Sequence, residues 1–186
     1  MRPPAYPQRQ RGFTLVELIM VMVLIGILGA VGSTHFADRE TYDAASFTDQ
    51  MRSLLRFAQK TAIAQNRSVF VVMDGARVAL CLNYQSDSSC ASANRVLAPG
   101  GGNSAATNTL SQCAGSSTWA CEGTPANVSY SSARSVFYFD ALGKPYLSTD
   151  TDGNLLSNFT APLVVTVTGG GITRSVTVEA ETGYVH

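Results

Sequence analysis

Histidine is scarce in this sequence of 186 residues, which contains only His35 and His186. Two histidines at such distant positions argue against a catalytic set of the Ser-His-Asp kind. A zinc site is disfavoured as well, because no Cys-x-x-Cys pair occurs and neither histidine stands near any of the four cysteines. The glycines at residues 100–102 lack the strand and helix context of a phosphate-binding loop. We therefore expect no enzyme activity and no cofactor.

Charge is also sparse, because charged residues make up 14% of the chain and 13 basic side chains balance 13 acidic ones. Arg2, Arg9 and Arg11 stand in a leading segment, residues 1–12, that contains no acid. The rest of the chain therefore has an excess of acid, and its basic residues form no cluster in the sequence. Nucleic-acid binding needs a clustered basic face, so no nucleic-acid partner is expected.

A long apolar run is the main feature that the sequence does have. Residues 13–32 contain a single charge, Glu17, and as a helix they would span about 30 Å, the thickness of the hydrocarbon layer of a bilayer. The arginines before the run predict a cytoplasmic amino terminus and an exported remainder. A cleaved signal peptide would have a shorter run with a small-x-small site at its end. A plain anchor has no use for Glu17, because an acid inside a membrane is costly and usually has a partner.

The residues around this acid form a distinctive pattern. A basic leader ends at Gly12, Phe13 follows, and Glu17 comes four residues later. This pattern resembles the prepilin processing motif, and the run as far as Val31 resembles the amino-terminal helix of type IV pilins. The resemblance implies that a prepilin peptidase removes residues 1–12 by cutting between Gly12 and Phe13, and that Phe13 is then N-methylated. It also implies that Glu17 pairs with the Phe13 ammonium of a neighbouring subunit during assembly.

The same resemblance implies a location and partners. The chain would wait in the bacterial inner membrane with its carboxyl-terminal part in the periplasm, and would then join other pilins in a pilus or a secretion pseudopilus. Small residues in the apolar run either allow close helix packing or are simply tolerated there; they are Gly26, Gly29, Ala30 and Gly32. Many major pilins carry a proline in this helix, but residues 31–34 contain none, which favours a minor pilin or a pseudopilin.

A second helical segment, residues 33–66, follows the apolar run. Its apolar residues recur on one face, which predicts packing against a sheet; they are Phe47, Met51, Leu54, Leu55, Ala58 and Ala62. Asn66 accepts left-handed backbone geometry, so the helix is expected to end there.

Residues 67–186 are predicted to form a β-rich head. Strand-like runs occupy residues 68–73, 77–83, 134–140, 163–168 and 172–179, with a last short strand at residues 184–185. Asp74-Gly75 and the three glycines at residues 169–171 are hairpin signals. The expected fold class is α+β, with a long amino-terminal helix packed on an antiparallel sheet, as in pilins.

Residues 85–127 are rich in Ser, Ala, Asn, Gly and Thr and are predicted to form a long surface loop tied by disulfides. An even number of cysteines beyond an exported anchor favours disulfides. Four cysteines allow three pairings, of which we favour the two local ones; the cysteines are Cys81, Cys90, Cys113 and Cys121. Trp119 is either an exposed contact residue or a cover for a disulfide.

A second resemblance is carried mainly by residues 51–73, MRSLLRFAQKTAIAQNRSVFVVM. This stretch is similar to the type II secretion protein H and FimT family of minor pseudopilins and minor pilins, and to the minor pilins of mannose-sensitive haemagglutinin pili. Some FimT-like pilins are thought to bind DNA through arginines near the carboxyl terminus, where this chain has Glu179 and Glu181 instead.

Two functional hypotheses follow. The first is a structural subunit of the minor class that acts by helix assembly. The second is a binding module, displayed on a filament, that recognises its target through the loop at residues 85–127. Residues 150–154, DTDGN, are either a calcium-binding turn or a plain Asx-rich turn.

Overall fold

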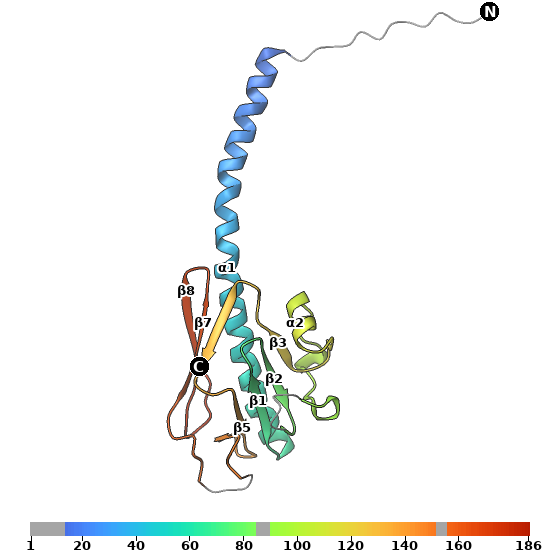
Figure 1. Cartoon of the computed structure of the whole chain (residues 1–186), viewed down its shortest axis with the longest axis vertical. Helices are drawn as coiled ribbons and strands as arrows, with labels where there is room; N and C mark the ends of the chain where they lie inside the picture. The colour runs from blue at the N-terminus through green and yellow to red at the C-terminus, as the bar shows by residue number, and fades with distance from the viewer. Residues whose placement is uncertain (1–13, 85–89, 152–155) are drawn as a thin grey trace, which may run out of the picture. The chain divides into compact units, whose positions relative to one another are not determined.

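The computed structural model describes residues 14–84, 90–151 and 156–186, with the backbone alone for residues 31–38 (Figure 1). The chain divides into two compact units, residues 1–38 and residues 39–186. One helix, α1 (Leu15–Gln65), contributes to both units.

The carboxyl-terminal end of α1 lies where the sequence predicts it. Asn66 has a positive φ of 49°. The Asn66 N–H donates to the Ile63 carbonyl at 3.3 Å, and the Arg67 N–H donates to the Ala62 carbonyl at 3.1 Å. These two bonds make a Schellman motif, which satisfies carbonyls that the helix leaves without partners.

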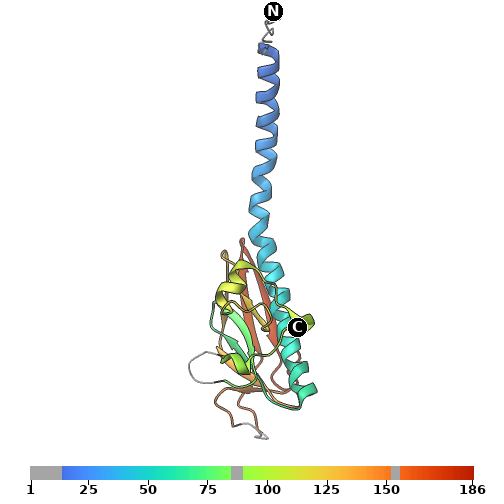
Figure 2. The same cartoon turned by 90° about the vertical axis from the view of Figure 1, so that its right-hand side faces the viewer.

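Residues 39–186 contain two antiparallel sheets that pack with the second part of α1. The first sheet has the order β3-β2-β1-β5-β6, and its strands are β1 (Val69–Met73), β2 (Arg77–Cys81), β3 (Cys121–Gly123), β5 (Val136–Phe139) and β6 (Pro145–Leu147). The second sheet has the order β4-β7-β8, and its strands are β4 (Val128–Ser132), β7 (Leu163–Gly169) and β8 (Ile172–Val178). The short helix α2 (Thr107–Gln112) lies on the side of the first sheet away from α1 (Figure 2). The predicted α+β fold is confirmed.

The apolar face of α1 forms the core with both sheets. All the residues of the predicted stripe are buried, from Phe47 to Ala62, and they share a cluster with Phe137 of β5 and Val165 of β7. The side chains of β1 alternate between two clusters. Val71 faces this core, whereas Val72 belongs to a second cluster that contains all four cysteines and Trp119. The five-stranded sheet is therefore covered on both faces.

Both predicted hairpins are present. Between β1 and β2 the Asp74 carboxylate accepts hydrogen bonds from the N–H groups of Ala76 and Arg77, and Gly75 has a φ of 86°. Between β7 and β8 only glycine fits at Gly170, since its φ is 59° and an added Cβ would lie 2.4 Å from the backbone nitrogen of Thr41. The β7–β8 turn therefore packs directly against α1.

The structure departs from the sequence predictions in three places. β3, β4, β6 and α2 were not predicted, and the head has two sheets rather than one. The last predicted strand is an isolated bridge between Val178 and Val185. The described parts of residues 85–127 are more than a surface loop, because they supply α2, β3 and buried side chains such as Trp119. β3 and β6 have three residues each, which is too short for alternation to show in a sequence.

Candidate assembly site

The first turn of α1 places Glu17. Thr14 precedes the helix, and its hydroxyl accepts a hydrogen bond from the Glu17 backbone N–H at 3.3 Å, while its carbonyl accepts one from the Leu18 N–H at 3.2 Å. Thr14 is therefore the N-cap, and Glu17 stands at the third helical position, as in a capping box. Gly12, Phe13 and the predicted cleavage bond lie outside the described residues.

The side chains that follow Glu17 form an apolar surface. Every large apolar residue from Leu15 to Leu28 is exposed, with values between 42% for Val21 and 74% for Leu15. A Cβ added at Gly26 or Gly29 would meet nothing within 4 Å, so these glycines leave the helix surface flat and accessible. Small residues of this kind allow two helices to approach closely.

Among the residues that the structure describes, no helix combines the length and the apolarity needed to cross a membrane.

The cysteines form the two local pairs favoured from the sequence, Cys81–Cys90 and Cys113–Cys121. Trp119 lies in the same cluster and is only 2% exposed, and its indole N–H donates to the Leu80 carbonyl at 2.8 Å. Of the two readings of Trp119, the structure therefore supports the cover over the disulfide cluster. The two disulfides and the indole ring fix residues 90–123 to the outer face of the five-stranded sheet.

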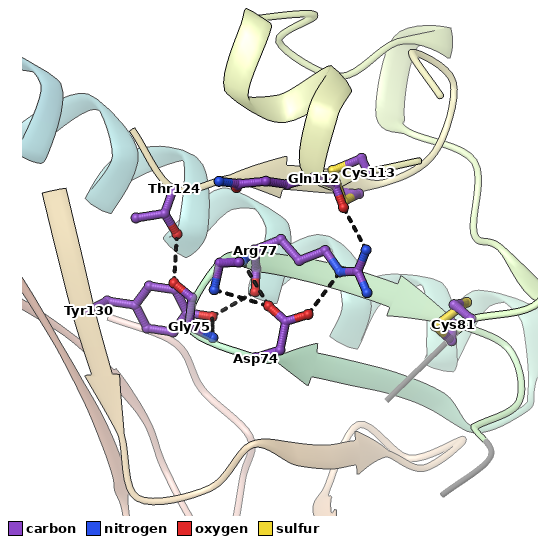
Figure 3. Close-up of polar contacts among 11 residues, drawn as sticks. Asp74, Gly75, Arg77, Cys81, Gln112, Cys113, Thr124 and Tyr130 are labelled. Atoms are coloured by element: carbon purple, nitrogen blue, oxygen red, sulfur yellow. Dashed lines mark hydrogen bonds and ion pairs between the residues drawn. A yellow bond between two sulfur atoms is a disulfide. The ribbon is translucent and has the colours of Figure 1, made fainter. Parts of the chain in front are cut away.

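A polar network at the tip of the β1–β2 hairpin joins the two sheets (Figure 3). The Arg77 side chain forms an ion pair with Asp74 at 3.0 Å and donates to the Gln112 carbonyl at the end of α2. On β4, the Tyr130 hydroxyl donates to the Arg77 carbonyl at 2.6 Å and accepts a bond from the Gly75 N–H at 3.0 Å. This network is architectural, because its polar groups are used in holding three segments of the head together.

The amino-terminal sequence matches a known sequence family. Residues 7–33 match the family described as the prokaryotic N-terminal methylation motif. The chain carries a prepilin-type amino terminus. This match covers residues 7–12 of the leader, the junction and Glu17, and it confirms the processing motif recognised from these residues. No curated protein matches the sequence.

Two solved structures are similar to this chain. The type IV minor pilin FimU of Pseudomonas aeruginosa PAO1 has a TM-score of 0.49 and 12% identity, over 81% of this chain and 90% of that one. The minor pseudopilin EpsH from the type 2 secretion system of Vibrio cholerae has a TM-score of 0.44 and 10% identity, over 77% of this chain and 94% of that one.

The calcium-binding turn predicted at residues 150–154 is described only in part. Residues 152–155 of the calcium candidate lie outside the described residues. Both oxygens of Asp150 accept hydrogen bonds from within the chain, from the Leu147 N–H and from the backbone and amide of Asn158. Burial alone would raise the pKa of Asp150, but these hydrogen bonds and the charge of Arg134 outweigh it and hold the pKa below its usual value. The Asp150 carboxylate thus holds its own turn in place through these hydrogen bonds.

Tyr130 gives the hairpin network a pH dependence. Burial raises the pKa of Tyr130 from 10 to about 12, although the bond from the Gly75 N–H favours the phenolate and offsets part of this effect. The unfolded chain releases the phenol proton near pH 10, whereas the folded chain keeps it to about pH 12. Between pH 10 and about pH 12 the phenol therefore ionises in the unfolded chain but not in the folded one, which favours unfolding. The contribution of Tyr130 to the free energy of unfolding is complete below pH 10 and is lost as the pH rises to about 12.

We expect the free energy of unfolding of the full chain in detergent to fall more steeply between pH 9 and 11.5 than that of Tyr130→Phe. Urea titrations followed by circular dichroism measure both slopes. Tyr184→Phe changes an exposed phenol and serves as the control, with the slope of the unmodified chain expected. Parallel pH profiles for the unmodified chain and Tyr130→Phe would contradict the shifted pKa.

Proposed function

We propose that the chain is a minor pilin or pseudopilin, a non-enzymatic structural subunit of a type IV pilus or a type II secretion pseudopilus. The observation that carries this proposal is the N-terminal methylation motif at residues 7–33. The capped first turn of α1 supports it, because it places Glu17 at the third helical position, and Glu17 comes four residues after the predicted new amino terminus in the sequence.

Processing creates the charge that assembly needs. Cleavage by a prepilin peptidase between Gly12 and Phe13 would leave an ammonium group on Phe13, which N-methylation preserves. The Glu17 carboxylate of a neighbouring subunit would then pair with this ammonium. Such a pair attracts strongly among apolar helices, because the local dielectric constant is low and little water screens the charges.

The exposed apolar side chains of α1 supply the rest of the interaction. Their surface would lie among lipids of the inner membrane before assembly and against other pilin helices afterwards. The head would face the periplasm, where an oxidising environment preserves the Cys81–Cys90 and Cys113–Cys121 disulfides. The subunit thus acts by packing and charge pairing rather than by chemistry at a pocket.

The form in which the cell holds the chain tests this function. Filaments are sheared from the native cells, and the filament and membrane fractions are examined by mass spectrometry for peptides of this chain. We expect the first residue to be a methylated Phe13 in filaments or in the membrane fraction, the latter favouring a pseudopilus or an assembly-priming role. Chains that keep Met1 in every fraction would contradict the proposal.

A further inference from the structure

A groove opens at the end of the five-stranded sheet where α1 finishes. Its volume is about 850 Å³, and its walls come from the start of β1, the end of β2 and the turn between β5 and β6. Among the described residues that line it, all except Asn94 lie outside the segment 85–127. The groove is therefore built by the sheet rather than by the segment that the sequence predicted to bind a target.

A row of aromatic rings crosses the sheet at this end. Phe70, Tyr138 and Tyr146 are partners across β1, β5 and β6, and all three line the groove. The ring centres of Phe70 and Tyr138 are 5.0 Å apart, and those of Tyr138 and Tyr146 are 5.3 Å apart. Phe70 is only half-buried, while Leu142, also in the lining, is 86% exposed and belongs to neither core cluster. The groove thus offers an apolar surface backed by packed rings.

Polar side chains with unused hydrogen-bonding groups surround this apolar surface. The amides of Asn66 and Asn83 are exposed and form no hydrogen bond within the described part of the chain. Each amide can both donate and accept. Asp140 uses its Oδ1 for two N–H groups of its own turn, and its Oδ2 accepts no hydrogen bond from a described residue. The rim can therefore bond to groups that are donors and acceptors at once, as hydroxyls are.

The groove has no excess of either charge. Its cations are Arg67 and Lys144, its acid is Asp140, and Lys144 already pairs with Glu181 at 2.8 Å. A strongly anionic ligand would be repelled by Asp140, and a cationic ligand would be repelled by Arg67. The charges therefore favour a neutral ligand.

The sheet edge beside the groove is closed to a peptide strand. β6 is the edge strand, and its residue Pro145 has no N–H. Tyr146 is paired with Tyr138 of β5, and the Leu147 N–H donates to the Asp150 carboxylate at 2.9 Å. A peptide that extends a sheet needs free main-chain groups along the edge strand. β6 has no free N–H for such a peptide.

We propose that this groove binds a short, neutral oligosaccharide. A sugar ring has C–H groups on its faces, which would pack against Phe70 and Leu142. The hydroxyls around its rim would bond to the amides of Asn66 and Asn83 and to the free oxygen of Asp140. Apolar walls with a few placed polar groups are the usual composition of a ligand site. Such binding adds a function to the structural subunit and does not depend on its assembly.

A panel of oligosaccharides tests the groove. The full chain is purified with both disulfides intact, in a detergent without a sugar headgroup that would compete for the site. It is applied to an array of short neutral and acidic oligosaccharides, and the affinity for the strongest neutral ligand is measured by isothermal titration calorimetry. We expect neutral oligosaccharides to bind, and acidic oligosaccharides with the same backbone to bind more weakly.

Variants of exposed residues locate the site without damage to the core. Asn83→Ala and Asn66→Gly each remove one amide, and glycine keeps the positive φ of residue 66. Each should weaken binding by about three- to tenfold, the effect of one lost hydrogen bond. Leu142→Ala should weaken it by a similar factor through lost apolar contact. Leu156→Ala changes a side chain that is 83% exposed and does not line the groove, so it should leave the affinity unchanged.

Three results would overturn the inference, provided that circular dichroism shows each chain to be folded. They are an array on which no neutral oligosaccharide binds, a preference for acidic oligosaccharides, and binding that Asn83→Ala and Leu142→Ala leave unchanged. The proposed function stands in all three, because it is tested separately by processing at Gly12 and Phe13 in filament and membrane fractions.

Discussion

Glu17→Ala should yield a chain that is processed and exported as before but is nearly absent from filaments. The change removes the carboxylate that we expect to pair with the Phe13 ammonium of a neighbour. Removing one partner of a buried ion pair costs about 3 to 5 kcal/mol, because the other charge stays unpaired in an apolar environment. We therefore expect incorporation to fall by at least about a hundredfold.

The helix itself should survive this substitution. The Thr14 hydroxyl bonds to the backbone N–H of residue 17, not to its side chain, so the cap does not depend on the carboxylate. Alanine also has the highest helix propensity. A loss of incorporation would thus report the missing charge rather than a broken helix.

The measurement is the ratio of this chain in sheared filaments to the chain in membranes, by quantitative mass spectrometry. Glu17→Gln keeps the shape without the charge and should fail like Glu17→Ala. Glu40→Ala removes an exposed acid of the same helix outside the motif and should assemble normally. Normal incorporation of Glu17→Ala would contradict the proposed pairing of Glu17 with a neighbouring subunit.

Much of the fold could be predicted because the informative segments are long and periodic. The buried stripe of α1 is set by a 3.6-residue repeat, and a helix of 51 residues gives that repeat room to show. Asn66 and Gly75 were recognisable because both residue types accept a positive φ, and Asp74 because its carboxylate accepts hydrogen bonds from the backbone of the turn. These signals are local, so a sequence alone can carry them.

The missed elements depend on contacts between distant residues. β3 pairs with β2 over only three residues, and what holds it there is the Cys113–Cys121 disulfide and the Trp119 ring. The polar composition of residues 85–127 suggested a solvated loop, because the few buried side chains are widely spaced in the sequence. The assembly site differs again. The sequence identifies Glu17 from a motif, but the partner that we propose for it belongs to another molecule.

The folded structure of residues 90–123 bears on the hypothesis that residues 85–127 form a binding loop. Deleting residues 85–127 would remove β3, Trp119 and three of the four cysteines, so the variant would lose both disulfides and part of its core along with any binding surface. No described feature of this segment favours a binding role over a structural one.

Trp119→Ala should be among the most destabilising single changes in the head. The indole ring is 2% exposed, and the Arg95 guanidinium lies over it at 4.5 Å from the ring centre. Removing a buried tryptophan costs about 3 to 5 kcal/mol through lost burial and the cavity that remains. The change also leaves the Leu80 carbonyl without its indole donor.

Urea unfolding of the full chain with both disulfides intact, followed by circular dichroism, measures this loss. Trp119→Phe keeps most of the apolar volume but not the N–H donor, so its cost should be intermediate. Leu97→Ala removes a neighbouring side chain that is 69% exposed and should change stability by less than about 0.5 kcal/mol. An unfolding midpoint for Trp119→Ala equal to that of Leu97→Ala would mean that the ring does not support the cluster. The large loss that we expect would instead show that residues 90–123 belong to the core, because a solvated loop would tolerate the change.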